Sequence, residues 1–382
     1  MASKKYAATF VIPCLNEANS IGALLEEANN VFKQDQETEW DILVSDNGSS
    51  DNSVQIAKRL GAKVAHASKK GYGSAVHSGI INASTPWVIY ADADGTYCPK
   101  DAVRLLKAAI KQSADLAMGS RLKGTVKAQA MPFLHRYLGT PVLSLLIRIL
   151  YGVEITDCNS GIRCINKESY LKWKIKSKGM EFASALIIKA ANAEANIIEI
   201  PVTLRRSKND RVPHLKKWRD GMRHLLVVLA GAPWLFWKLG VILIFLSSLF
   251  AIPSLWGERV VFGTFSIFGP HTLAISTVIG FYGTLCFNLS LLIYATSPTK
   301  RPPPQLIKWL LEIPEGLLFW FLTGFTGLFV TATLFLLYKW YQVDFGGLNF
   351  VQFALFFMYM TVIPTGLVMG IFQAHLEKRV DI

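Results

Sequence analysis

The chain has 382 residues, which suits two or three domains, and its mean hydropathy of +0.32 is high for a soluble protein. Its net charge of +13 suits anionic lipid surfaces or phosphorylated ligands as partners. Nucleic acid is disfavoured because no recognition motif accompanies the charge. The five cysteines form no Cys-x-x-Cys pair, which argues against a disulfide framework or a zinc site.

Residues 1–230 alternate short apolar stretches with helical segments. Strands are predicted over residues 7–13, 41–46, 62–66, 88–91, 115–119 and 197–204. Helices are predicted to end near residues 32, 60, 82, 112 and 195. This alternation predicts an α/β domain with a Rossmann-like, mixed but mostly parallel sheet.

The apolar stretch Val88–Ala91 runs directly into Asp92 and Asp94. In parallel sheets ligands bind outside the carboxyl ends of strands, which is where this pair falls. Alternate residues of an extended chain point the same way, so both carboxylates can face one cation. Two carboxylates, with a diphosphate completing the shell, suit Mg²⁺ or Mn²⁺. The alternative is a solvated acidic turn.

A glycine turn, Lys70–Gly73, precedes the helix that ends near residue 82. Its functional interpretation is close backbone approach to a phosphate, with lysine adding positive charge. The alternative is a tight loop before a helix. Residues 131–151 form a long apolar segment interrupted by Gly139 and Pro141. The segment is too charged and broken to span a bilayer, so we expect an interfacial helix there, with a domain-packing helix as the alternative.

Residues 231–382 are expected to form an all-α membrane domain of four transmembrane helices. The predicted spans cover about 235–257, 272–295, 316–338 and 350–372. Eight Lys or Arg lie between Arg205 and Arg223, within and before a second interfacial helix predicted at about 214–230. The loop 296–315 carries three and the tail two, against one in each remaining loop. This bias predicts a cytoplasmic N-terminal domain, middle loop and tail.

Six short motifs in the first 170 residues have a recognisable order and spacing: Pro13–Glu17, Asp46–Asp51, Lys70–Gly73, Asp92–Asp94, Gly119–Arg121 and Ser160–Arg163. Together they resemble family-2, GT-A-fold glycosyltransferases and, more narrowly, the polyprenyl-phosphate (dolichyl-phosphate) glycosyltransferases. The resemblance covers residues 7 to about 225. It implies a GT-A domain over residues 1–230 in a multi-pass protein of a bacterial inner membrane.

The resemblance also implies site residues. A nucleotide-sugar donor would be held by Pro13, Asn16, Glu17, Asp46, Asn47, Lys70, Gly71, Asp92, Ala93, Asp94, Arg206 and Arg211. The acceptor phosphate would contact Arg121, Arg136, Ser160 and Arg163. Asp92 and Asp94 would bind the metal and, with Arg121, would be catalytic. The chain departs from the family pattern at Asn47 and Gly95, which bears on donor identity.

The implied reaction is inverting, metal-dependent transfer of a hexose to polyprenyl phosphate at the cytoplasmic membrane face. UDP-glucose is the favoured donor and GDP-mannose the other candidate. The acceptor phosphate is already an anion at neutral pH, so the reaction needs little general-base help. The alternatives are transfer to a lipid hydroxyl, and a non-catalytic nucleotide-binding membrane module or sugar-lipid translocase. Assembly as a homo-oligomer is left open.

Overall fold

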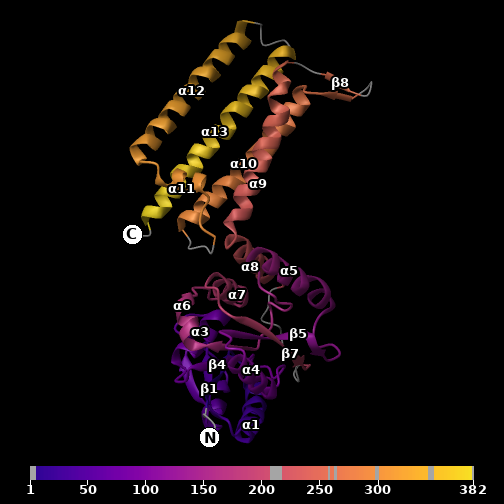
Figure 1. The fold of residues 1–382 in the computed structure, drawn as a ribbon, viewed down its shortest axis with the longest axis vertical. Coiled ribbons are helices and arrows are strands. Elements are labelled where there is room, and N and C mark those ends of the chain that lie inside the picture. The colour runs from indigo at the N-terminus through magenta and orange to yellow at the C-terminus, as the bar shows by residue number, and fades with distance from the viewer. Residues whose placement is uncertain are drawn as a thin grey trace. The chain divides into compact units, whose positions relative to one another are not determined.

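The computed structural model describes residues 6–206, 217–256, 259–261, 265–296, 301–342 and 348–380. Contacts divide the chain into two compact units, Met1–Leu229 and Ala230–Ile382 (Figure 1). The first unit is α/β and the second is mainly helical. The predicted Arg211 lies outside the described residues.

The first unit is built on a seven-stranded sheet with the order β3-β2-β1-β4-β6-β5-β7. Its strands are β1 (Tyr6–Cys14), β2 (Thr38–Asp46), β3 (Lys63–His66), β4 (Trp87–Tyr90), β5 (Leu116–Val126), β6 (Arg163–Asn166) and β7 (Ile197–Leu204). Strand β6 runs antiparallel to β4 and β5, whereas the other pairs are parallel. The predicted mixed, mostly parallel sheet is therefore confirmed.

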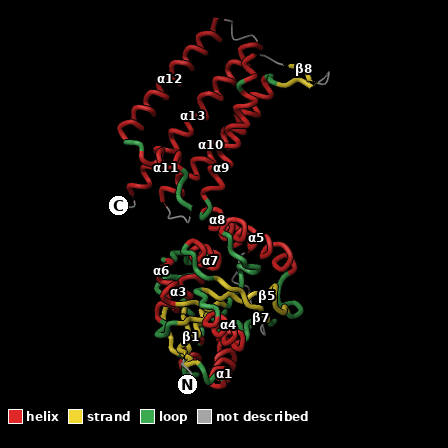
Figure 2. Tube along the Cα trace, in the orientation of Figure 1, coloured by secondary structure: helices red, strands yellow, loops and turns green. Residues whose placement is uncertain are grey.

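Helices cover both faces of this sheet (Figure 2). They are α1 (Ala18–Gln34), α2 (Ser53–Arg59), α3 (Tyr72–Asn82), α4 (Pro99–Lys111), α6 (Lys167–Trp173) and α7 (Phe182–Asn192). Strand β1 is almost continuously apolar because a central strand is buried on both faces. Phe10 and Ile12 of β1 belong to one core with Leu25 of α1 and Leu105 of α4. This core fixes the strand ends that carry the polar residues.

Strand β6 was not predicted. It is only four residues long and begins with an arginine, so neither length nor hydrophobicity indicates a strand in the sequence. Arg163 is nevertheless fully buried, because its guanidinium donates to backbone carbonyls of the surrounding fold. Strand β5 is also longer than predicted, with an irregularity in its pairing between Ser120 and Thr125.

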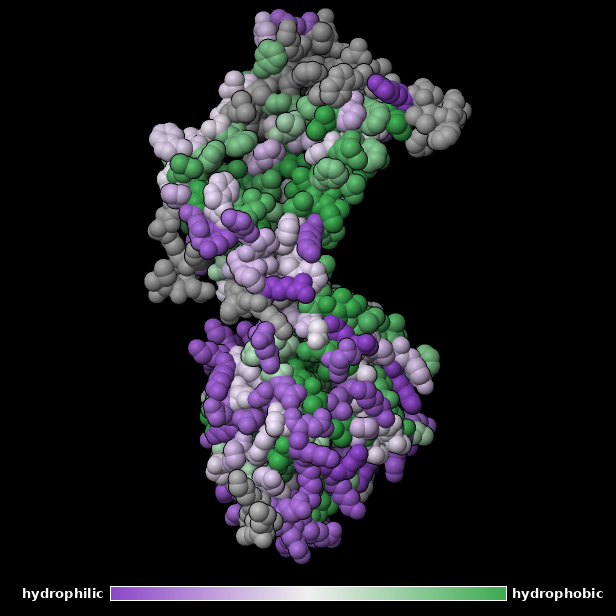
Figure 3. Space-filling model, in the orientation of Figure 1, coloured by the Kyte–Doolittle hydropathy of each residue, from purple (hydrophilic) through white to green (hydrophobic). Residues whose placement is uncertain are grey.

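Two helices of the first unit expose apolar side chains. The predicted helix 131–151 is divided into a π-helix, η1 (His135–Gly139), and α5 (Thr140–Tyr151), and Phe133 and Ile149 are 76% and 61% exposed. Figure 3 shows this surface in green over α5. Helix α8 (Lys217–Ala230) likewise exposes Met222 and Leu226. Exposed apolar faces of this kind suit a lipid surface. The interfacial position of both helices stays a prediction, and these exposed faces are consistent with it.

The second unit holds α9 (Pro233–Ala251), η2 (Pro253–Trp256), the hairpin β8 (Arg259–Val261) and β9 (Phe265–Ile267), α10 (Pro270–Thr296), α11 (Gln305–Glu312), α12 (Glu315–Gln342) and α13 (Leu348–Val380). Within the described residues, three helical segments are long and apolar enough to cross a membrane: Pro233–Ala251, Pro270–Thr296 and Ala354–Glu377. Helix α12 covers the predicted span 316–338, but several of its side chains lie outside the description. The number of four spans therefore stays a prediction.

The first span is shorter than the predicted 235–257. Its α-helix ends at Ala251, and the short 3₁₀ helix η2 begins at Pro253. Proline lacks the backbone N–H that a continuing α-helix needs, which accounts for the earlier end.

Small residues allow α9 and α10 to approach closely. A Cβ added to Gly240 would come within 2.8 Å of the Gly283 carbonyl oxygen, and one added to Gly283 within 2.9 Å of the Ile244 nitrogen. Glycine at such a crossing lets helices associate through backbone contact, which is common in membranes. Asn288 of α10 donates to the Gly366 carbonyl of α13 at 2.7 Å and links a third helix to this pair.

Candidate active site

A cleft of about 550 Å³ lies at the carboxyl ends of β1, β2 and β4, where such sheets bind ligands. Eight residues predicted to hold the donor line it: Pro13, Glu17, Asn47, Lys70, Gly71, Asp92, Ala93 and Asp94. Asn16 and Asp46 lie beside it in the chain. Arg206 is described and does not line the cleft. The sheet thus gathers residues from four separate motifs into one site.

The end of β2 is held by a dense set of hydrogen bonds. Asp46 accepts from the backbone N–H groups of Gly48 and Ser49, each at 3.1 Å, and lies 3.2 Å from His66 Nδ1. Burial by itself raises the pKa of Asp46, but the hydrogen bonds from Ser49, Gly48 and His66 outweigh it and hold that pKa below its usual value. Asp46 therefore stays ionised at the end of β2, next to the cleft-lining Asn47.

Asn47 uses its amide to fix the glycine turn. Its Nδ2 donates to the Lys69 carbonyl at 2.9 Å, and its Oδ1 accepts from Gly71 N–H at 2.7 Å. A carboxylate could accept the second bond but could not donate the first. The amide at this position therefore has a structural reason in this chain.

Asn16 joins the ends of β1 and β2. It lies in the left-handed region, with φ of 56°. Its Oδ1 accepts from Ser50 N–H at 2.8 Å, and its own N–H donates to Ser49 Oγ at 3.0 Å. The Glu17 N–H donates to Ser53 Oγ at 2.8 Å. The Pro13–Glu17 motif thus holds the turn that follows β2 in place through these hydrogen bonds.

The two glycines of the turn are explained by packing. Gly71 has a φ of +130°, and an added Cβ would collide with the Lys178 carbonyl. Gly73 N–H donates to the Gly179 carbonyl at 3.2 Å, and its Cβ would come within 2.8 Å of the Ser177 carbonyl oxygen. The turn therefore approaches the 177–179 segment closely, and Lys70 lines the cleft beside it.

Asp92 and Asp94 lie on the cleft beyond β4 and are each held in place. Tyr72 Oη donates to Asp92 Oδ1 at 3.0 Å. Asp94 Oδ1 accepts from the Thr96 N–H at 3.1 Å and from its hydroxyl at 2.6 Å. Burial, followed by the nearby Asp92, raises the pKa of Tyr72 well above its usual value. Tyr72 therefore remains a protonated donor to Asp92 at any physiological pH.

Gly161 provides the space for the Asp92 carboxylate. A Cβ at this position would have all three atoms of the carboxyl group within 3.0 Å. The Gly161 N–H donates to Tyr97 Oη at 2.8 Å, and burial raises the pKa of Tyr97 to about 12. The Ser160–Arg163 motif therefore packs against the Asp92 carboxylate through Gly161.

The donor set fits a hard divalent cation. Asp92 and Asp94 offer carboxylate oxygens on one cleft, which is the chemistry that Mg²⁺ and Mn²⁺ select. Across the described residues, no group of three or more His, Cys, Asp or Glu side chains converges as a metal site. A bound cation would therefore take its other ligands from a phosphorylated ligand or water.

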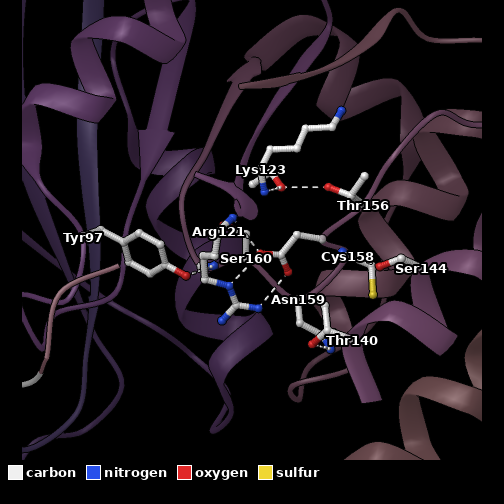
Figure 4. A network of polar contacts seen from close by, with 12 residues as sticks. Tyr97, Arg121, Lys123, Thr140, Ser144, Thr156, Cys158, Asn159 and Ser160 are labelled. Atoms are coloured by element: carbon white, nitrogen blue, oxygen red, sulfur yellow. Dashed lines mark hydrogen bonds and ion pairs between the residues drawn. The ribbon is translucent and has the colours of Figure 1, made fainter. Parts of the chain in front are cut away.

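Arg121 is locked to a buried carboxylate (Figure 4). Its Nε and Nη2 donate to the two oxygens of Asp157, each at 2.7 Å, and its backbone N–H donates to the same group at 2.9 Å. Asp157 is fully buried. Burial lowers the pKa of Arg121, but Tyr97 and Asp157 outweigh it, and the pKa is raised overall. Arg121 therefore stays charged beside the cleft.

A second carboxylate holds the loop that presents Asp157. Glu199 accepts from the backbone N–H groups of Thr156 and Asp157, each at 2.9 Å, and pairs with Lys123 at 2.9 Å. Its side chain is 1% exposed. The position of Arg121 therefore depends on two acidic residues from distant parts of the chain.

The other predicted acceptor residues lie elsewhere. The Arg163 guanidinium donates to the carbonyls of Ser160, Cys158 and Ala183, and Ser160 is 1% exposed. Arg136 lies over the Tyr137 ring, 5.4 Å from its centroid. None of these three described residues, nor Arg121, lines the cleft. Their contact with an acceptor phosphate stays a prediction from the motifs.

Replacing Asp157 with alanine should destabilise the protein strongly. The change leaves the nearly buried Arg121 guanidinium without its carboxylate, and breaking a buried pair in this way typically costs about 3–5 kcal/mol. Thermal unfolding of the full chain, followed by tryptophan fluorescence, measures the effect. Arg148→Ala is the control, because Arg148 Nη2 lies 3.8 Å from Glu154 Oε2 and the Glu154 side chain is exposed. An equal fall in the thermal midpoints of the two variants would refute the buried role of Asp157.

Sequence reasoning missed several residues of the site. Tyr72 lies inside a motif whose glycines and lysine alone gave a prediction, and Asp157 precedes the Ser160–Arg163 motif by three residues. Arg219 and Arg223 of α8 line the cleft, although they read in the sequence as part of a basic segment before the membrane. Glu199 gives no sequence signal, because it lies on a half-buried strand.

Comparison with known proteins agrees with this geometry. The profile described as Glycosyl transferase family 2 matches residues 9–173. An uncharacterized glycosyltransferase of Mycobacterium tuberculosis is 32% identical over 197 residues, covering 52% of this chain and 84% of that protein. The chain belongs to glycosyl transferase family 2. With the observed sheet, this membership confirms the predicted GT-A fold class.

Similar proteins from Haloferax volcanii include two that are named as hexose transferases. A low-salt glycan biosynthesis hexosyltransferase is 32% identical over 223 residues, and the match covers 58% of this chain but only 53% of that relative. A dolichyl-phosphate hexose transferase is 28% identical over 197 residues, covering 51% of this chain and 81% of that protein. The family-2 match at residues 9–173 lies within the first unit, and the chain spans about half the length of the first of these relatives.

Proposed function

We propose that this family-2 chain transfers a hexose from a nucleotide sugar to a polyprenyl phosphate at a membrane surface. The observation that carries the proposal is the cleft, in which Asp92 and Asp94 meet the ends of β1 and β2 and the cationic side of α8. The similarity to a dolichyl-phosphate hexose transferase supports the acceptor class. The apolar helices of the second unit support a lipid substrate.

The donor would bind across the ends of β1, β2 and β4. The β2 turn, fixed by Asp46 and Asn47, would receive the nucleoside, and the diphosphate would face Asp92 and Asp94. UDP-glucose is the donor we favour, with GDP-mannose as the other candidate. Lys70 lies on the same cleft and would add positive charge near the diphosphate.

The chain's own residues would hold the reactants in place. Tyr72 and Gly161 fix the Asp92 carboxylate, and Thr96 fixes Asp94. A divalent cation held there would neutralise charge on the leaving nucleoside diphosphate. The acceptor phosphate is already an anion and needs no general base to deprotonate it. Its direct attack on the anomeric carbon, in a single displacement, would invert the configuration of that carbon. Positioning of the two substrates is then the main task of the protein.

We infer the side of the membrane from the charge bias of the sequence. The excess of Lys and Arg before α9 favours a cytoplasmic catalytic unit. Nucleotide sugars are made in the cytoplasm, so the donor would bind the catalytic unit from that side.

The test is a substrate panel with the purified full chain in lipid nanodiscs. Radiolabelled UDP-glucose and GDP-mannose are offered with a polyprenyl phosphate, with the matching polyprenol and with diacylglycerol. We expect label in the prenyl phosphate only, and loss of transfer when divalent cations are chelated. Transfer to a hydroxyl lipid alone would favour the hydroxyl alternative, whereas nucleotide binding without transfer to any lipid would favour a non-catalytic module.

A further inference from the structure

Helix α8 presents three different faces. Asp220 and His224, four residues apart, are 3% and 7% exposed, and Asp220 also lines the cleft. Met222 and Leu226 are 54% and 57% exposed. Arg219, four residues before Arg223 on the same face, lines the cleft with it.

Two contacts fix the orientation of α8 in the first unit. Ser184 Oγ lies 2.8 Å from His224 Nδ1, which ties α8 to α7. Tyr151 Oη donates to the Val228 carbonyl, which ties α8 to α5. Figure 1 shows α8 and α5 next to each other. These contacts set the rotation of α8 with which Arg219 and Arg223 line the cleft.

The two arginines differ in their surroundings. Arg219 Nε lies 3.5 Å from Asp220 Oδ1, and its side chain is 53% exposed. Arg223 is exposed. Four carboxylates line the same cleft: Glu17, Asp92, Asp94 and Asp220. Asp92 and Asp94 are the two expected to bind a cation, so the two guanidinium groups line a cleft in which bound metal would neutralise that pair.

We propose that Arg219 and Arg223 bind the phosphate of the prenyl acceptor. The inference rests on the proposed function and extends it to residues that the motifs do not include. Arg121 and Arg163 already donate to Asp157 and to backbone carbonyls, and neither lines the cleft. The α8 arginines are the cleft-lining guanidinium groups of the described chain, and guanidinium binds phosphate through paired hydrogen bonds.

The apolar face of α8 gives this site its lipid specificity. Met222 and Leu226 are one residue and three residues from Arg223, so lipid-facing and phosphate-facing groups lie within one turn of helix. A phosphate carried on a prenyl chain can use both faces, whereas inorganic phosphate can use only the arginines. The same helix would therefore hold the headgroup while its apolar side contacts the bilayer.

The test combines kinetics with direct binding, using the full chain in nanodiscs. Arg219→Gln and Arg223→Gln should each raise the KM for a short-chain prenyl phosphate by roughly 10- to 100-fold, the loss expected for one charged hydrogen bond. The KM for the nucleotide sugar should stay within about threefold. Arg148→Gln is the matched control, since this α5 cation is half-exposed and does not line the cleft.

Equilibrium binding of radiolabelled prenyl phosphate, without donor, tests the site independently of turnover. We expect wild type to bind it, both variants to lose binding, and the matching prenol to bind without dependence on either arginine. Competition by inorganic phosphate alone, equal to that of the prenyl phosphate, would show a simple anion site and overturn the lipid assignment.

Two further outcomes separate the possible errors. An equal rise in the donor KM, or an equal effect of Arg148→Gln, would overturn the assignment of these arginines to the acceptor. If wild type transfers sugar to no prenyl phosphate but binds it through Arg219 and Arg223, the proposed function fails and the phosphate site stands. If wild type does not bind prenyl phosphate at all, the phosphate site itself is refuted.

Discussion

Asp94→Ala should reduce transfer by about 10³-fold or more. The change removes a carboxylate from the cation and diphosphate shell, and stabilisation worth about 4 kcal/mol corresponds to three factors of ten in rate. Asp92→Ala should also reduce turnover strongly and weaken donor binding, because Asp92 lies on the same side of the cleft. The measurement is initial rate at saturating acceptor, repeated across a titration of Mg²⁺ and Mn²⁺.

The control for both variants is Asp41→Ala. Asp41 is a carboxylate of β2 paired with Lys63, and it does not line the cleft. The variant should keep its rate and its metal dependence. If Asp92→Ala and Asp94→Ala both turn over near the wild-type rate with metal dependence intact, the metal assignment is wrong.

Gly161→Ala should reduce turnover by at least about 100-fold without removing any functional group. The added methyl would collide with the Asp92 carboxylate, and the Gly161 backbone already lies against Tyr97. The carboxylate must then leave its place beside Tyr72. Because a displacement of about 1 Å at a reacting centre can cost about 100-fold, we expect at least that fall in turnover, together with a higher metal requirement.

Gly22→Ala provides the comparison for this glycine. Gly22 lies on α1, and an added Cβ would make only ordinary contact with Ile56 at 3.5 Å. It should leave turnover unchanged and the thermal midpoint equal or slightly higher. Should Gly161→Ala retain full activity with an unchanged metal titration, the idea that this glycine makes room for Asp92 is refuted.

The sequence determined the framework of this protein. The near-continuous apolar stretch of β1 and its alternation with helices predicted a mostly parallel sheet, and that sheet is observed. The Asp pair was placed at a strand end because hydrophobicity stops where a buried strand leaves the sheet. Apolar length likewise predicted helices long enough to cross a membrane, and three such segments lie within the described residues. All of these features are local, because the hydrophobic pattern of a strand and the length of an apolar helix depend only on residues that are close in the sequence.

Tertiary structure decided which charges are available to a substrate. Arg121 and Asp157 are 36 residues apart in sequence, and Arg163 reaches the Ala183 carbonyl 20 residues away, so no local pattern shows that these arginines are already engaged. Helix α8, read in sequence as basic and membrane-facing, turns two arginines into the cleft. A charge pattern gives the sign of a surface but not its partners, because ion pairs and buried donors are fixed by the path of the whole chain.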